Sequence, residues 1–214
     1  MGPADSNHKN ERPLMMQFSP RYDRPAISLI ATGLGEDGVS LYLGDSEGAR
    51  DIALLKEQGI TTVINCAVNL DFNYVNDPVQ KEEPGKVAAG HGVVRAYKIG
   101  LIDGEGNPAR MMLAGYYILD GALKQVMPEK ESYPHRERGN VLVHCRGGRS
   151  RSVALVALYL HKNLPERFPT LDDALAHVRV KRELRPDEWF ETPKPMLVEA
   201  ARQASDAIDL LEGK

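Results

Sequence analysis

The amino-acid sequence predicts an α/β protein, with a mostly parallel central sheet flanked by helices. Short runs of branched apolar residues alternate along the chain with longer segments of helical periodicity. One such run, Val141, Leu142 and Val143, contains no polar residue, as is typical of a parallel strand covered on both faces. A polar loop and an apolar helix follow it, and open α/β sheets bind their ligands at this end of a strand.

The first part of the domain supplies two strands and one helix. We predict a strand over residues 39–43, a helix from near Ser46, and a second strand over residues 61–66. Gly59 is the expected C-terminal stop of the helix. Its apolar face consists of Ala49, Ile52 and Leu55.

Two charged connections flank the next strand and helix. Residues 71–92 are acidic and contain glycine and proline, so we expect a mobile surface loop there, followed by a strand over 93–99. Pro108 suits the first turn of a helix that ends at Pro128, and residues 128–139 form a second exposed insertion. The apolar stripe of this helix is Met112, Tyr116, Leu119, Leu123 and Val126.

The last third of the chain is mostly helical after the strand over 141–143. An apolar helix begins at Arg151. Thr170 and Asp173 form a capping box that predicts the start of the next helix. Its buried face is Leu171, Ala174, Leu175 and Val178. A final helix covers about residues 194–210.

Length and composition indicate a single domain and restrict the class of partner. We assign residues 1–25, which are polar and contain several prolines, to a flexible arm, and residues 26–214 to one domain with insertions near 71–92 and 128–139. The net charge of −3 argues against nucleic-acid binding, and no apolar run approaches the ~20 residues of a membrane span. Two cysteines without metal-ligand spacing favour a cytoplasmic protein. We expect a monomer without a cofactor or metal.

Residues 144–152 carry the strongest functional signal in the sequence. They read His-Cys-Arg-Gly-Gly-Arg-Ser-Arg-Ser, so that five residues separate Cys145 from Arg151. A backbone loop of this size can surround a tetrahedral oxyanion with inward N–H groups, while the guanidinium of Arg151 grips two of its oxygens. Gly147 and Gly148 permit the backbone angles of such a nest. A helix N-terminus and nearby cations would lower the pKa of the Cys145 thiol and yield a nucleophilic thiolate.

The loop resembles the signature sequence His-Cys-x-x-Gly-x-x-Arg-Ser of the cysteine-dependent protein phosphatases, in particular their dual-specificity branch. Residues 41–65 resemble the first strand, first helix and second strand of that family, and residues 174–187 resemble its penultimate helix and the following turn. The resemblance covers about residues 39–205. It implies the fold of that branch, with the signature loop between a central strand and a central helix. The implied activity is hydrolysis of phosphate monoesters through a cysteinyl-phosphate intermediate.

The resemblance assigns roles to several residues around the nucleophile. Asp103 lies where the family keeps its general acid, in a glycine-rich loop between strand and helix, and Glu105 is the alternative acid. A hydroxyl at Ser152 would hydrogen-bond the thiolate, and His144 would organise the loop. Cys66 is expected to be an ordinary buried cysteine, with a protective disulfide to Cys145 as the less favoured alternative. The phosphate-binding residues would be Arg146, Gly147, Gly148, Arg149, Ser150 and Arg151.

The substrate class is left open by the sequence. Arg146 and Arg149 add two cations to the loop, and phosphoinositide phosphatases resembling this family carry basic residues at these places. The same arginines could instead support a single phosphomonoester. We favour phosphorylated proteins, bearing phosphotyrosine and also phosphoserine or phosphothreonine, over phosphoinositides.

Two other functions are less favoured. Rhodanese-like sulfurtransferases also have a Cys-Arg loop, but they place Arg five residues after Cys, where this chain has Ser150. An inactive phosphate-binding module usually lacks the Cys, the Arg or the acid, and this chain keeps all three.

Overall fold

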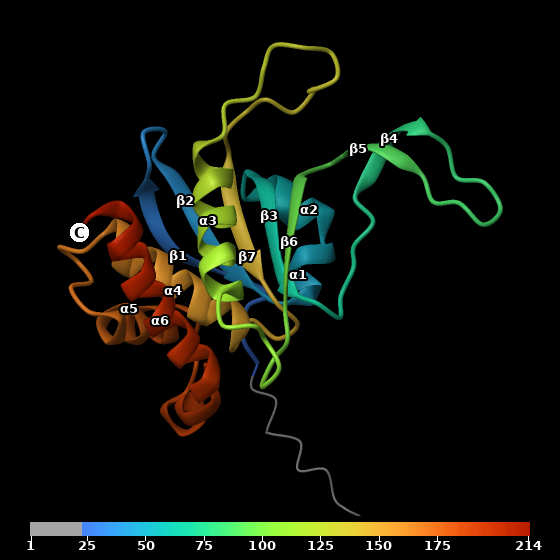
Figure 1. The fold of residues 1–214 in the computed structure, drawn as a ribbon. Helices are drawn as coiled ribbons and strands as arrows, with labels where there is room; N and C mark the ends of the chain where they lie inside the picture. Colours follow the sequence, from blue (N-terminus) through green and yellow to red (C-terminus); the bar gives the residue numbers. More distant parts are fainter. Residues whose placement is uncertain (1–22) are drawn as a thin grey trace, which may run out of the picture.

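The computed structural model describes residues 23–214 as a central sheet with helices on both faces (Figure 1). Residues 1–22, and with them most of the predicted arm, lie outside the described part. In chain order the elements are β1 (Ile27–Leu34), β2 (Val39–Gly44), α1 (Ser46–Arg50), α2 (Ile52–Glu57), β3 (Ile60–Ala67), β4 (Val75–Gln80), β5 (Ala89–Gly92), β6 (Arg95–Leu101), α3 (Met111–Lys124), β7 (Asn140–His144), α4 (Arg151–Asn163), α5 (Leu171–Lys181), the 3₁₀ helix η1 (Pro186–Glu191) and α6 (Pro195–Glu212).

The five-stranded sheet has the order β1-β2-β7-β3-β6, and β7 lies at its centre. The pairs β2–β7, β7–β3 and β3–β6 are parallel, whereas β1 pairs antiparallel with β2. This arrangement confirms the prediction of a mostly parallel sheet flanked by helices.

Both faces of the sheet are covered, as the apolar sequence of β7 predicts. Val141 and Val143 pack into the large core beneath α3, α4, α5 and α6. Leu142 points to the opposite face and packs with residues of α1 and α2, such as Ala49 and Leu55. Because β7 is buried on both sides, the loop that follows it is anchored in the middle of the molecule.

The structure corrects the predictions for the first part of the domain. β1 was not predicted, and its alternation of buried and exposed residues suits an edge strand in antiparallel pairing. The helix expected from Ser46 is two short helices, because Asp51 interrupts it and caps α2 by accepting a hydrogen bond from Leu54 N at 3.1 Å. Ile52 begins α2 and is 40% exposed, so its assignment to the buried face was wrong.

Three further corrections concern the middle of the chain. Residues 71–92 contain the hairpin of β4 and β5, and the exposed residues of these strands gave no apolar signal. Pro108 precedes α3, because residues 108–110 form a turn before the helix begins at Met111. Val126 lies beyond the end of α3 and is exposed, so it does not belong to the buried stripe.

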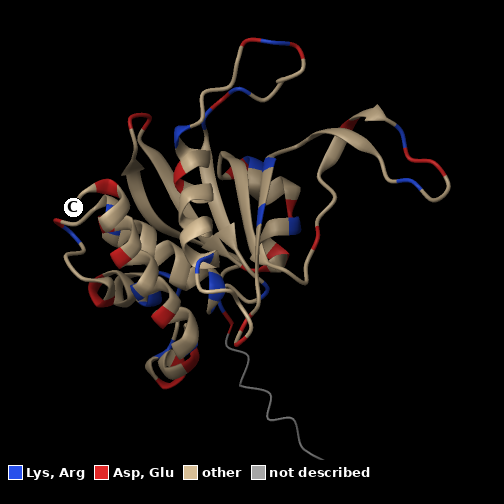
Figure 2. Ribbon diagram, viewed as in Figure 1, with Lys and Arg blue, Asp and Glu red and all other residues tan. Residues whose placement is uncertain are grey.

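The β4–β5 hairpin and the segment 125–139 project from the body of the domain, and both carry charges of either sign (Figure 2). The central strands carry few charges, which is consistent with their burial. In the described part of the chain, none of the helices combines the length and the apolar composition that a bilayer span requires.

Candidate active site

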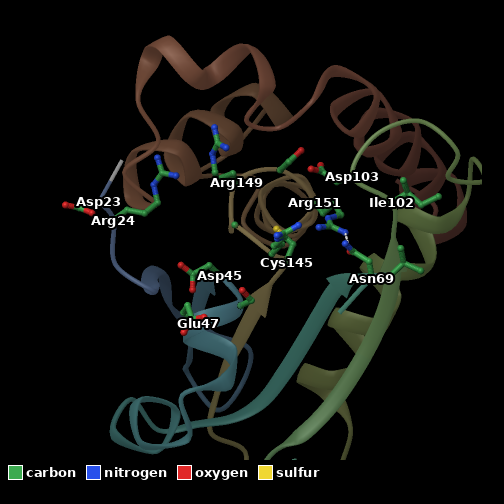
Figure 3. Close-up of a pocket in the computed structure, with 15 residues that line it drawn as sticks. Asp23, Arg24, Asp45, Glu47, Asn69, Ile102, Asp103, Cys145, Arg149 and Arg151 are labelled. Carbon is green, nitrogen blue, oxygen red and sulfur yellow. Dashed lines mark hydrogen bonds between the residues drawn. The ribbon is translucent and has the colours of Figure 1, made fainter. Parts of the chain in front are cut away.

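The loop between β7 and α4 lies at the bottom of a cavity of about 920 Å³ (Figure 3). β7 ends at His144, Cys145 follows at 3% exposure, and α4 begins at Arg151. Gly148 has a φ of +63°, and a Cβ at this position would lie 2.5 Å from the carbonyl oxygen of Gly44. Only glycine fits there, which confirms the conformational argument for Gly148. Gly147 does not adopt a positive φ.

The surroundings of Cys145 favour the thiolate. Burial by itself raises the pKa of the thiol, but several other interactions outweigh it and lower the pKa below its usual value. The hydroxyl of Ser152 lies 3.1 Å from Sγ, and the backbone N–H groups of Ser152 and Arg149 also donate toward the sulfur. The charge of Arg151 acts in the same direction. The loop thus holds a buried thiol whose ionisation is favoured by its surroundings.

His144 contacts the loop backbone rather than the cavity. Its Nδ1 donates to the carbonyl of Cys145 at 3.0 Å, and its ring packs edge-on against Phe72 with centroids 5.2 Å apart. Burial lowers the pKa of His144, so the imidazole is neutral at neutral pH. These contacts suit the predicted organising role of His144.

Arg151 is 4% exposed and is held by two other segments of the chain. Its Nη1 donates to Asn69 Oδ1, just after β3, and to the carbonyl of Leu101 at the end of β6, both at 3.1 Å. Its buried Nε has no hydrogen-bond partner among residues 23–214. A guanidinium anchored at Nη1 presents a free donor to an anion bound above Cys145.

The structure separates the two candidate acids. Asp103 lines the same cavity as Cys145 (Figure 3). Glu105 instead lines a second cavity of about 250 Å³, between the loop after β6 and the start of α6. A general acid must reach the leaving group above the nucleophile, so the geometry favours Asp103.

Comparison with known proteins agrees with this geometry. No family model matches the chain. The chain is 32% identical over 142 residues to dual specificity protein phosphatase 1 of Arabidopsis thaliana, a match that covers 66% of this chain and 57% of that protein. The chain therefore spans little more than half of the length of this relative.

In its sequence the chain is similar to a dual specificity protein phosphatase.

Solved structures show the same fold at low sequence identity. Human DUSP28 superposes with a TM-score of 0.57 at 17% identity, over 86% of this chain and 99% of that one. The Yvh1 phosphatase domain of Chaetomium thermophilum gives 0.58 at 21%, over 86% and 96%. The human tyrosine phosphatase-like serine/threonine/tyrosine-interacting protein gives 0.54 at 23%, over 86% and 97%. These likenesses establish the dual-specificity phosphatase fold of the chain.

The sequence analysis did not identify Arg182 as a residue that contacts the loop between β7 and α4. Arg182 follows α5 and is completely buried. Its Nε donates to the carbonyl of Gly148 at 3.1 Å and its Nη2 to that of Gly147 at 3.4 Å, while Nη1 donates to Ser28 Oγ at 3.0 Å. Burial lowers the pKa of Arg182 to about 10, which still leaves the guanidinium charged at neutral pH.

The two extra arginines of the loop between β7 and α4, Arg146 and Arg149, both line the cavity. Arg149 Nη2 lies 3.2 Å from Glu191 Oε1 and 3.6 Å from Glu188 Oε2, both on η1. Because η1 was not predicted, nothing in the sequence pointed to these carboxylates. Arg149 is therefore already paired with carboxylates, of which Glu188 also pairs with Arg24.

The structure also shows the surroundings of Ser150 and Cys66, two further residues that the sequence analysis singled out. Ser150 precedes α4 and lines the cavity, and its hydroxyl accepts a hydrogen bond from Lys194 N at 3.0 Å. Cys66 is buried on β3, and its pKa is raised by burial and by the neighbouring charge of Cys145. Both cysteines are free thiols, and a redox pair between them stays a prediction.

Proposed function

We propose that the chain hydrolyses phosphate monoesters on proteins, both phosphotyrosine and phosphoserine or phosphothreonine. The observation that carries this proposal is the convergence of three groups on one cavity. Cys145, with its lowered pKa, lies at the bottom, Arg151 is anchored beside it, and Asp103 lies on the rim. The similarity to dual specificity protein phosphatase 1 of Arabidopsis thaliana supports the same activity.

The proposed reaction has two steps. First, Cys145 Sγ attacks phosphorus, the bond to the leaving oxygen breaks, and the carboxyl of Asp103 gives its proton to that oxygen. The product is a cysteinyl phosphate and a free alcohol or phenol. A water molecule then attacks phosphorus, passes a proton to the Asp103 carboxylate, and releases inorganic phosphate and the thiolate. Arg151 and the loop N–H groups bind the phosphoryl oxygens in both steps.

The surroundings of Ser152 suit the second step. When the phosphoenzyme breaks down, Cys145 leaves as a thiolate. The Ser152 hydroxyl, 3.1 Å from Sγ, would donate to that developing charge. A thiolate nucleophile also needs a reducing compartment, which supports the proposed cytoplasmic location.

A direct test compares phosphotyrosine, phosphoserine and phosphothreonine peptides with phosphoinositide vesicles under identical conditions. We expect hydrolysis of the peptides to dominate, and we expect acid quenching during turnover to trap phosphate on Cys145. A preference for the vesicles would favour the phosphoinositide alternative. Turnover of the peptides with no trapped phosphoenzyme would contradict the covalent mechanism.

Replacement of Arg149 discriminates between these substrate classes. Because Glu188 and Glu191 already pair with Arg149, Arg149→Ala should lower kcat/KM by about five-fold or less, and equally for a phosphopeptide and a polyphosphorylated inositol lipid. Steady-state kinetics with both substrates measure the ratio. A loss confined to the inositol lipid would show that Arg149 leaves its carboxylates to bind a second phosphate.

Replacement of Asp103 tests the general acid. Asp103→Asn should slow phosphotyrosine and alkyl phosphates by roughly 10²–10⁴-fold, because their leaving oxygens need a proton. An aryl phosphate with a very acidic phenol should lose much less. The matched control is Glu105→Gln, because Glu105 lines the other cavity. This substitution should leave the rates for all of these leaving groups unchanged. If Glu105→Gln gives the graded loss and Asp103→Asn does not, the acid is Glu105.

A further inference from the structure

Lys194 connects the loop of the nucleophile to the loop of the candidate acid. Its backbone N–H donates to Ser150 Oγ at 3.0 Å, and Ser150 lies five residues after Cys145. Its side-chain Nζ donates to the backbone carbonyl of Asp103 at 2.7 Å and lies 3.2 Å from Asp103 Oδ2. One residue from a third segment of the chain therefore contacts both sides of the site.

The backbone of Lys194 is held firmly. Lys194 caps the N-terminus of α6, and its carbonyl accepts hydrogen bonds from Leu197 N at 3.0 Å and Val198 N at 3.2 Å. Leu197 and Ala201 bury one face of α6 in the core. The side chain of Lys194 thus extends from a fixed position toward Asp103.

The loop that carries Asp103 is fixed mainly at its base. Asn107 accepts a hydrogen bond from Ile102 N and donates to Ile102 O, both at 2.8 Å. Between them, Gly104 and Gly106 have φ values of +151° and +109° and offer no side chain for packing. The direction of the Asp103 carboxylate is therefore left to its contact with Lys194.

Lys194 does not line the cavity above Cys145, whereas Asp103 does. The side chain of Lys194 can therefore act on the reacting atoms through Asp103, whereas its backbone N–H contacts the Cys145 loop through Ser150. The ammonium also has the charge to complement the carboxylate that remains once Asp103 has given up its proton.

We propose that Lys194 is the positioning residue for the general acid Asp103. This inference rests on the proposed function. Lys194 holds the Asp103 carboxyl toward the leaving oxygen before proton transfer and stabilises the carboxylate afterwards, until water returns a proton to it. Its hydrogen bond to Ser150 sets the distance between the acid and the loop that holds the phosphate.

The test is Lys194→Met, which keeps the length of the side chain and removes its charge and its donors. We expect kcat for phosphotyrosine and alkyl phosphates to fall by roughly 10- to 100-fold, with little change in KM, because a misplaced group loses rate rather than affinity. An aryl phosphate with an acidic phenol should react almost normally. Lys194→Arg, which keeps the cation, should recover most of the lost rate.

A double-mutant cycle gives the sharpest readout. If Lys194 acts through Asp103, adding Lys194→Met to Asp103→Asn should cause no further loss of rate. Losses that multiply in the double variant would overturn the proposal. An equal loss of rate by Lys194→Met for all leaving groups would also overturn the proposal. That result would mean that the substitution disturbs the Cys145 loop through Ser150.

Two controls separate this outcome from loss of folding and from failure of the proposed function. Lys124→Met removes a comparable ion pair with Asp120 on α3 and should leave all rates unchanged. Thermal unfolding checks each variant, and Lys194→Gln replaces Lys194→Met if the latter is unfolded. Absence of phosphate-monoester hydrolysis by the unchanged protein would overturn the proposed function itself, whereas losses of rate that multiply in the double variant would overturn only the role of Lys194.

Discussion

Cys145→Ser is expected to abolish turnover while the protein still binds phosphate. A serine hydroxyl does not ionise near neutral pH, so the interactions that stabilise the Cys145 thiolate cannot activate it. Removal of a nucleophile costs on the order of 10⁶-fold in kcat. The loop N–H groups and Arg151 remain in place, so calorimetry with inorganic phosphate should give an affinity close to that of the unchanged protein.

The matched control is the other cysteine of the chain. Cys66→Ala removes a buried thiol on β3 and should retain turnover, since Cys66 does not line the cavity. Measurable hydrolysis by Cys145→Ser would mean that another group attacks phosphorus. Loss of phosphate binding in the same variant would mean that the thiolate, rather than the loop, maintains the anion site.

Arg151→Lys should also be strongly damaging, with a loss of about 10³-fold in kcat/KM. The guanidinium bonds to Asn69 and Leu101 through one nitrogen and keeps its Nε free for the phosphoryl group. An ammonium on a flexible stem has no planar fork, so it cannot satisfy both sides at once.

The control for Arg151→Lys is the same exchange at a surface site. Arg202 lies on α6 and pairs with Asp172 at 2.7 Å, far from the loop in the sequence and half exposed. Arg202→Lys should leave kcat/KM unchanged. Near-normal catalysis by Arg151→Lys would show that another cation holds the phosphate, and Arg146 would then be the first residue to examine.

The sequence was sufficient where local chemistry determines the structure. The apolar residues of β7 and the capping box at Thr170 are local patterns, and both elements form as predicted. The split at Asp51 was harder, because Asp51 can serve as a helix residue or as a cap, and periodicity alone does not distinguish the two. The β4–β5 hairpin has almost no buried face, so it left no apolar alternation to detect.

The residues of the candidate site also divide into those that the sequence indicated and those that it did not. Cys145, Arg151 and Ser152 lie close together in the sequence, where the loop after β7 meets the start of α4, so their spacing alone indicates that they act together. Asn69 and Arg182 reach that loop from other segments of the chain. Their contacts arise only when the sheet and the helices pack. No spacing along the sequence could have indicated them.

The buried contact of Arg182 has a consequence for the polarity of the loop. In each trans peptide the C=O and the next N–H point in opposite directions. When Arg182 draws the carbonyls of Gly147 and Gly148 to itself, the amides of Gly148 and Arg149 turn the other way, and the Arg149 amide donates toward Cys145. The buried guanidinium of Arg182 thereby orients two peptide groups of the loop. Because Arg182 fixes their direction when the chain folds, the inward direction of these amides does not depend on a bound anion.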